Sequence, residues 1–384
     1  MLNKTRLLTP GPTPLPESVR LALSKDMIHH RKPDFERLMG GIQEKLKLLF
    51  GTSQPVLPLS CSGTGAMTAA VYSLFEPGDK VLVARAGKFG ERWEEIAASR
   101  GLELVSLEAP WGSSVSASDV ESVLDAEPGV KGVLIQLCET STGVLHPVQE
   151  IARATRGRES LLVVDGISAV GISPCPMDEW GIDCLLTGSQ KGLLLPPGLA
   201  LLALSERAWG RAEKVKPGCY YFNLPAEREI LQKGQTHFTS PINLLNGLEA
   251  SLDLLLENGL EAVYRKQWAL TMLVREGVEA MGLEPFVKED FAWGLTSVKL
   301  PPNVPGGEVL RFAQEKLKVF MAGGQDRLKG KIVRIGHMGW VDWGDCLAGL
   351  CALRMGVAAS GEALQDAPCM EAAMAAYEQA LARL

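Results

Sequence analysis

Residues 185 to 193 read Leu185-Leu186-Thr187-Gly188-Ser189-Gln190-Lys191-Gly192-Leu193. An apolar run typical of a buried strand ends here in small polar residues and one lysine, and a second apolar run follows Gly198. A lysine between two buried strands is costly to keep charged, and a lowered amine pKa makes lysine a Schiff-base nucleophile. Taken alone, a lysine that extends from a strand end into solvent is the commoner explanation. Residues elsewhere in the chain are needed to distinguish a Schiff-base lysine from a solvent-exposed one.

The amino-acid composition indicates what kind of protein this is and excludes several others. The chain has 384 residues, of which 46% are hydrophobic and 22% charged, so we expect a soluble globular protein with a large core and two domains. The net charge of -6 and the absence of a basic block argue against a nucleic-acid partner. Eight scattered cysteines without metal-ligand spacing predict no metal site and a reducing, cytoplasmic location. The charged, proline-rich first 16 residues predict no secretion or membrane segment.

Apolar runs and helical segments alternate through the first half of the chain. We expect strands at residues 56–60, 80–84, 102–107, 130–137 and 161–164, and helices at 66–75, 91–100 and 118–124. This alternation predicts an α/β domain with a mainly parallel sheet. In such sheets ligands bind at the carboxyl ends of the strands.

Small polar clusters fall at those strand ends. Cys61-Ser62-Gly63-Thr64-Gly65 leads into a helix, and free N–H groups at a helix start form an anion site. Ser and Thr are also ordinary helix caps, so this cluster alone is weak. Glu139-Thr140-Ser141-Thr142-Gly143 is a second cluster. Asp165 follows four aliphatic residues, and it either caps a helix or pairs with a buried cation.

The second half of the chain has a different pattern. Residues 241–283 are mostly helical and long enough to bridge two lobes, and strands at 292–300 and 331–335 alternate with helices at 308–317, 342–355 and 371–384. We expect a smaller α+β domain here. The predicted organisation is an N-terminal arm over residues 1–20, a large domain over 21–258 and a small domain over 259–384.

Six motifs occur in one order: Ser62-Gly63-Thr64-Gly65, Glu76-Pro77-Gly78-Asp79, Glu139-Thr140-Ser141-Thr142-Gly143, Val164-Asp165, Gly188-Ser189-Gln190-Lys191 and Val333-Arg334-Ile335-Gly336. In this order they resemble the class V aminotransferases, which are pyridoxal-phosphate enzymes of fold type I. The most similar branch is that of the alanine-glyoxylate and serine-pyruvate aminotransferases. The resemblance covers roughly residues 7 to 355, and six ordered motifs are far more specific than one. It implies a large domain with a mostly parallel, seven-stranded type of sheet.

The resemblance implies a role for each matching residue at the cofactor. Lys191 matches the lysine that holds pyridoxal phosphate as an internal aldimine, and Asp165 matches the aspartate that pairs with the pyridine nitrogen. The residues that match the phosphate cradle are Ser62, Gly63 and Thr64, and those near the ring hydroxyl and the lysine are Thr140 and Gln190.

Further positions match the ring and the substrate. Phe89 stands where relatives often carry a tryptophan that stacks on the ring, although a core aromatic is the competing interpretation. Arg334 matches the arginine that binds the substrate carboxylate, and Gly11 lies in the arm that borders the pocket. Thr239 matches a residue that reaches the phosphate of the neighbouring subunit, which implies a homodimer with the site at its interface. Arg31 is interpreted as structural at that interface, over contact with a second substrate carboxylate.

The implied reaction is amino-group transfer from a small amino acid (alanine, serine or aspartate) to a 2-oxo acid (glyoxylate or pyruvate). A cysteine desulfurase or related lyase is the first alternative, but desulfurases place a histidine before the lysine, where this chain has Gln190. They also carry a nucleophilic cysteine on a mobile loop, whereas Cys346 and Cys351 fall in an expected helix. A non-catalytic subunit on the same scaffold is the second alternative, and the presence of Lys191, Asp165 and Arg334 argues against it.

Overall fold

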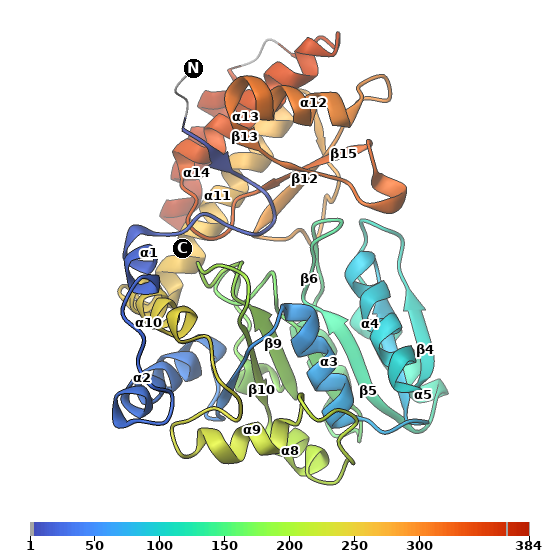
Figure 1. Ribbon diagram of the computed structural model, residues 1–384. Helices are drawn as coiled ribbons and strands as arrows, with labels where there is room; N and C mark the ends of the chain where they lie inside the picture. Colours follow the sequence, from blue (N-terminus) through green and yellow to red (C-terminus); the bar gives the residue numbers. More distant parts are fainter. Residues whose placement is uncertain (1–3, 366–367, 384) are drawn as a thin grey trace.

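The computed structural model describes residues 4–365 and 368–383, and it has two lobes (Figure 1). The larger lobe is built on a seven-stranded sheet in the order β2-β10-β9-β8-β5-β3-β4. Its strands are β2 (Val56–Leu59), β3 (Lys80–Arg85), β4 (Glu103–Glu108), β5 (Val130–Gln136), β8 (Leu161–Asp165), β9 (Cys184–Gly188) and β10 (Ala200–Leu204). The only antiparallel pairs in this sheet are the two that include β10, so the expected mainly parallel, seven-stranded sheet is confirmed.

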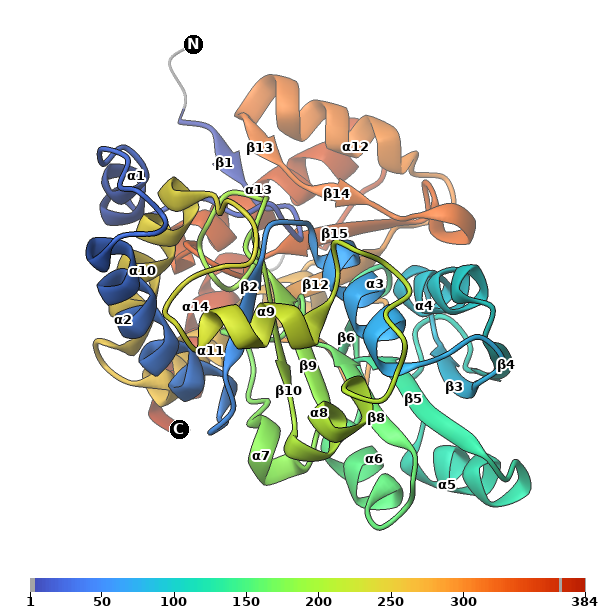
Figure 2. The same ribbon diagram turned by 60° about the horizontal axis from the view of Figure 1, so that its bottom comes forward.

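Helices surround this sheet (Figure 2). They are α1 (Glu17–Leu23), α2 (Pro33–Phe50), α3 (Gly63–Leu74), α4 (Lys88–Arg100), α5 (Ala117–Ala126), α6 (Val148–Thr155), α7 (Met177–Trp180), α8 (Glu206–Ala212), α9 (Leu224–Leu231) and α10 (Ile242–Leu256). Because the central strands are covered by helices, β8, β9 and β10 are buried along their whole length. This explains why they read as uninterrupted apolar runs in the sequence.

The smaller lobe carries a four-stranded antiparallel sheet in the order β11-β12-β15-β14. Its strands are β11 (Glu284–Pro285), β12 (Leu295–Lys299), β14 (Ala322–Gly323) and β15 (Ile332–Gly336), and its helices are α11 (Leu260–Ala280), α12 (Gly306–Phe312), α13 (Trp343–Ala359) and α14 (Cys369–Arg383). A short hairpin in the larger lobe pairs β6 (Cys138–Glu139) with β7 (Val144–Leu145). The expected α+β character of the C-terminal part agrees with this lobe.

The first residues of the chain pack with the last third. Strand β1 (Arg6–Leu7) pairs in parallel with β13 (Val319–Phe320), and Leu8 is buried in the apolar core of the smaller lobe. In Figure 1, the blue β1 lies within the upper, C-terminal lobe. The arm is therefore an ordered part of the fold from residue 4, and residues 1–3 lie outside the described residues.

The long helical segment expected at 241–283 is two helices, α10 and α11, separated at Gly259 (φ +76°). Buried residues of α10 belong to the core of the larger lobe, whereas Leu270 and Leu273 of α11 belong to that of the smaller lobe. The break lets each helix bury its apolar face in a different core. The break coincides in position with the expected boundary at residues 258/259, which stays a prediction.

Two helices begin three residues earlier than expected, and both shifts affect the strand ends. Helix α3 starts at Gly63 rather than at residue 66, and α4 starts at Lys88 rather than at residue 91. Gly63, Thr64 and Phe89 therefore lie in first helical turns, where backbone N–H groups are free. The last expected helix is confirmed as α14, except that residue 384 lies outside the described residues.

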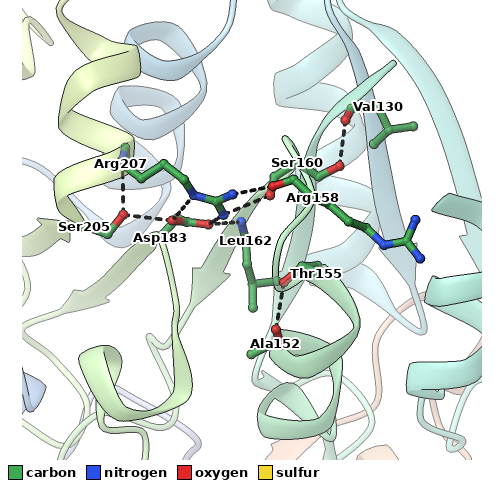
Figure 3. A network of polar contacts seen from close by, with 10 residues as sticks. Val130, Ala152, Thr155, Arg158, Ser160, Leu162, Asp183, Ser205 and Arg207 are labelled. Carbon is green, nitrogen blue, oxygen red and sulfur yellow. Dashed lines mark hydrogen bonds and ion pairs between the residues drawn. The ribbon is translucent and has the colours of Figure 1, made fainter. Parts of the chain in front are cut away.

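The amino ends of β8 and β9 are joined by a polar network (Figure 3). The Asp183 carboxylate accepts hydrogen bonds from Leu162 N (2.8 Å), Ser205 Oγ (2.8 Å) and the Arg207 guanidinium. Arg207 in turn donates to the carbonyl of Ser160 (3.1 Å). Because both strands are fixed at this end, their opposite, carboxyl ends are held in a defined relative position.

Among the described residues, no helix has the length and apolar character needed to cross a membrane.

Candidate active site

The first turn of α3 forms the floor of a small cavity. Ser62 is the N-cap, and its hydroxyl accepts a hydrogen bond from Gly65 N (3.4 Å). A Cβ on Gly63 would lie 2.3 Å from Cδ1 of Ile167, so a larger residue here would require the Ile167 side chain to move. The remaining N–H groups and the hydroxyls of this turn are donors of the kind that bind anions, and the assignment of a phosphate to them stays a prediction.

Asp165 ends β8 and is buried. Its carboxylate accepts a hydrogen bond from Ile167 N (2.7 Å), and it forms no ion pair with the described residues. Burial raises the pKa of Asp165 to about 7, and the hydrogen bond from Ile167 and the charges of Lys191 and Arg92 oppose this shift. The carboxyl group is therefore suited to receive a cationic partner, which would favour its ionised form.

Lys191 lies three residues after β9, with only 8% of its surface exposed. Burial lowers the pKa of its amine to about 8, and the cations Arg334 and Arg92 contribute to this shift. The Nζ atom donates a hydrogen bond to the carbonyl of Pro10 in the N-terminal arm. A surface lysine is thereby excluded, and the amine has the lowered pKa that a nucleophile needs.

The arm covers the lysine closely. At Gly11 the backbone has φ +96°, and a Cβ there would lie 2.5 Å from Cδ of Lys191. Thr13 adds hydrogen bonds from its N–H to Gln190 O (3.2 Å) and from its hydroxyl to Lys191 O (3.3 Å). A larger residue at position 11 would therefore strain the backbone and require the Lys191 side chain or the arm to shift.

These elements enclose a cavity of about 210 Å³. Its lining includes the expected residues Ser62, Gly63, Thr64, Phe89, Thr140, Asp165, Gln190 and Lys191. It also includes four residues to which the sequence assigned no role, namely Arg92, Cys138, Ile167 and Ser168. The cavity thus unites turns that are up to 130 residues apart in the chain.

Three expected residues do not line this cavity. Gly11 contacts Lys191 from the arm, as described above. Arg334, on β15, is buried behind Thr140 and donates hydrogen bonds to Thr140 O (2.7 Å) and Gly323 O (2.9 Å). Thr239 is exposed and is not part of the lining, so within one chain the structure does not place it in the cavity.

Arg31 is engaged by the loop that precedes Thr239. Its guanidinium donates to Thr236 O (2.6 Å), His237 O (3.1 Å) and Gln235 Oε1 (3.1 Å). These contacts occupy the fork of Arg31 with backbone and amide oxygens. They support the structural interpretation of Arg31 over contact with a substrate carboxylate.

Glu139 is an organising residue that sequence reasoning missed. Its buried carboxylate accepts hydrogen bonds from Phe89 N (3.1 Å), Gly90 N (3.1 Å) and Gln136 Nε2 (2.9 Å), and also from Ser141. Burial raises its pKa, and these hydrogen bonds oppose the shift. Glu139 therefore fixes the start of α4, and with it the position of Phe89. The available signal was an acid two residues after the end of the strand expected at 130–137.

Replacing Glu139 should destabilise the fold through those backbone donors. Glu139→Leu leaves at least two buried N–H groups without an acceptor, at roughly 1–3 kcal/mol each, so we expect the free energy of unfolding to fall by about 3 kcal/mol. Glu139→Gln keeps one acceptor oxygen and should lose less. Denaturant unfolding compares both variants with Glu95→Leu, a substitution at an exposed position on α4. Equal stability of the two leucine variants would contradict this role.

The residues of the cavity fit pyridoxal phosphate. The first turn of α3 offers uncharged donors for a phosphate, and Asp165 offers a carboxylate for a protonated ring nitrogen. The side-chain oxygen of Gln190 is buried and has no hydrogen-bond partner among the described residues, so it can accept one from a ligand. Lys191 supplies an amine within the same cavity.

Known proteins are similar to this chain in sequence and in fold. The family model described as "Aminotransferase class-V" matches residues 10–329. A soluble hydrogenase small subunit from Synechococcus sp. is 36% identical over 94% of this chain and 95% of its own length. An L-aspartate–glyoxylate aminotransferase from Paracoccus denitrificans is 33% identical over 100% and 98%. The solved structure of ureidoglycine-glyoxylate aminotransferase from Bacillus subtilis superposes with a TM-score of 0.92 at 27% identity, covering 98% of this chain and 99% of the other. The chain belongs to the class V aminotransferases, and it is a pyridoxal-phosphate-dependent enzyme that transfers an amino group.

Proposed function

We propose that this enzyme moves the amino group of alanine, serine or aspartate to glyoxylate, with pyruvate as a second acceptor. The observation that carries the proposal is the single cavity in which Lys191 and Asp165 meet the anion site of α3, with Arg334 directly behind Thr140. The relatives from Paracoccus and Bacillus, both named for glyoxylate, support the choice of acceptor.

Each side chain has a task that follows from its surroundings. Bound pyridoxal phosphate supplies an electron sink for charge that develops at the substrate's α-carbon. Lys191, whose pKa is lowered to about 8, is partly uncharged near neutral pH and can take a proton from that carbon and return it. Asp165 holds a proton on the ring nitrogen as an ion pair. Arg334 orients the substrate through its carboxylate: its Nε and Nη1 donate to backbone carbonyls, and no described residue accepts a hydrogen bond from its Nη2, which leaves that group to donate to the substrate.

The donor screen tests this proposal. Steady-state rates with alanine, serine and aspartate should be highest with glyoxylate as the acceptor, and lower with pyruvate. Incubation with cysteine should release no sulfide above background, because both candidate nucleophiles, Cys346 and Cys351, lie on helix α13. Catalytic sulfide release would favour the desulfurase alternative, and failure to take up pyridoxal phosphate would favour a non-catalytic subunit.

We further propose that the enzyme is a cytoplasmic homodimer in which Thr239 reaches the partner's phosphate site. All eight cysteines are free, which fits a reducing compartment. Tyr220, with 82% of its surface exposed, lies near Thr239 beside the stacked pair Tyr221 and Phe238 (4.6 Å between ring centroids). Exposed aromatic groups of this kind are common in interfaces.

Mixed dimers test whether Thr239 acts across the interface. Thr239→Ala should weaken pyridoxal-phosphate binding roughly tenfold, the effect of losing one hydrogen bond to a charged group. When this variant is mixed with Lys191→Ala, one site of each hybrid dimer combines an intact Lys191 with an intact Thr239. We expect that site to regain normal affinity and activity. A mixture no more active than the separate variants would place Thr239 outside the partner's site.

A further inference from the structure

We propose that Arg92 is the counter-ion of the cofactor's phosphate, held in place by the ring of Phe89. No role for this arginine follows from the motifs of the sequence, and it lies outside all six of them. The inference rests on the assignment of pyridoxal phosphate to the cavity.

Arg92 contacts both the first turn of α3 and the ring of Phe89. It is on α4, one turn after Phe89, and both side chains line the cavity. Its Nη1 atom donates a hydrogen bond to Thr64 Oγ1 (3.3 Å) in the first turn of α3, and its Cζ atom is 4.8 Å from the centroid of the Phe89 ring. In Figure 1, α3 and α4 lie next to each other, and they contact directly. The guanidinium therefore reaches the anion site and rests on an aromatic face.

The charge of the cavity calls for such a group. A phosphate monoester carries about -1.5 to -2 charges at pH 7, and a helix N-terminus supplies roughly half a positive charge. Ser62, Gly63 and Thr64 are uncharged. The only cations in the described lining are Lys191, whose amine binds the cofactor elsewhere, and Arg92. Within the described part of the chain, Arg92 forms no ion pair with a carboxylate.

The chemistry of arginine suits this position. A planar guanidinium can stack on an aromatic ring and present several donors to a phosphate, whereas a lysine ammonium is a single flexible point charge. The charge of Arg92 also acts on the rest of the site, because it favours the ionised form of Asp165 and the neutral form of Lys191. Arg92 is thus a cofactor-binding residue that also helps to set the protonation of both.

Comparing two ligands tests the proposal, because pyridoxal lacks the phosphate. Equilibrium titrations followed by absorbance and intrinsic fluorescence would give the Kd of pyridoxal phosphate and of pyridoxal for each variant. For Arg92→Gln we expect the Kd of pyridoxal phosphate to rise roughly 30-fold, as for a lost charged hydrogen bond, and that of pyridoxal less than threefold. Arg92→Lys keeps the charge, so its Kd for pyridoxal phosphate should lie between those of wild type and Arg92→Gln. Its Kd for pyridoxal should not differ from the wild-type value.

The matched control is Arg100→Gln. Arg100 is on the same helix and also lies over an aromatic ring, that of Tyr72 (5.2 Å), but it donates to Phe75 O away from the cavity. Its substitution should leave both Kd values unchanged. Thermal unfolding shows whether each variant is folded. If Arg92→Gln does not fold, the Kd values of Arg92→Lys are compared with those of wild type instead.

The possible outcomes separate the roles. Equal losses for pyridoxal phosphate and pyridoxal would show that Arg92 acts through Phe89 or the ring, and would overturn the proposal. An unchanged Kd for pyridoxal phosphate would overturn it as well. If the wild-type protein bound neither compound, the cofactor assignment itself would fail, a result distinct from any difference between variants.

Discussion

Lys191→Ala is expected to reduce the rate of amino transfer by roughly 10⁴-fold or more, because one substitution removes both a nucleophile and a general base. The buried position of the amine and its lowered pKa of about 8 are the physical grounds for both roles. The purified variant should also lack the visible absorbance that wild-type protein shows with bound pyridoxal phosphate.

Steady-state kinetics and absorbance spectra measure this loss, with Lys131→Ala as the control. Lys131 pairs with Glu159 on the surface at 3.0 Å, so its removal should leave the rate unchanged. A Lys191→Ala variant that retained a tenth of the wild-type rate would show that another group moves the proton.

Asp165→Asn should lower the rate by roughly 10²- to 10³-fold, as for other groups that stabilise charge in a transition state. The amide is close in shape to the carboxylate but cannot form an ion pair with the ring nitrogen. We expect pyridoxal phosphate still to attach to Lys191, with a shifted absorbance maximum. Normal rates in Asp165→Asn would contradict the role of the carboxylate.

The same substitution has a predictable effect on stability in the cofactor-free protein. Folding raises the pKa of Asp165 from 3.8 to about 7, mainly through burial, so the folded state holds this proton more tightly than the unfolded state. The contribution to stability is therefore full below pH 3.8 and is lost as pH rises through 7. Wild type should therefore lose stability as pH rises from 3.8 to 7, whereas Asp165→Asn has no carboxyl group to titrate. Thermal unfolding should show that the stability of Asp165→Asn rises relative to that of wild type over this range. Parallel curves for the two proteins would contradict the raised pKa.

Local sequence patterns were sufficient to predict the main strands of the larger lobe and the residues at their ends. Buried parallel strands are continuous apolar runs, and the residues that follow them meet at one edge of the sheet, so Asp165 and the turn at Ser62 could be placed together. The motif order then added the role of Lys191. These inferences depend on local spacing, which a sequence displays directly.

Other features depend on contacts between distant segments, which local patterns do not display. The pairing of β1 with β13 joins segments more than 300 residues apart, and the break at Gly259 follows from packing against two different cores. Arg92 and Glu139 were missed for a related reason. Glu139 accepts from backbone N–H groups at the start of α4, and Arg92 lies on α4 itself over the Phe89 ring. The true start of this helix, three residues before the expected one, places both contacts.

The central claim is that one cavity holding Lys191 and Asp165 performs amino transfer. A single half-reaction tests it most directly: protein loaded with pyridoxal phosphate is mixed with aspartate, alanine or serine in the absence of an acceptor. We expect loss of the visible absorbance together with one equivalent of the corresponding 2-oxo acid per active site, and recovery of the absorbance when glyoxylate is added. Protein that binds the cofactor but releases no 2-oxo acid from any of the three donors would contradict the claim.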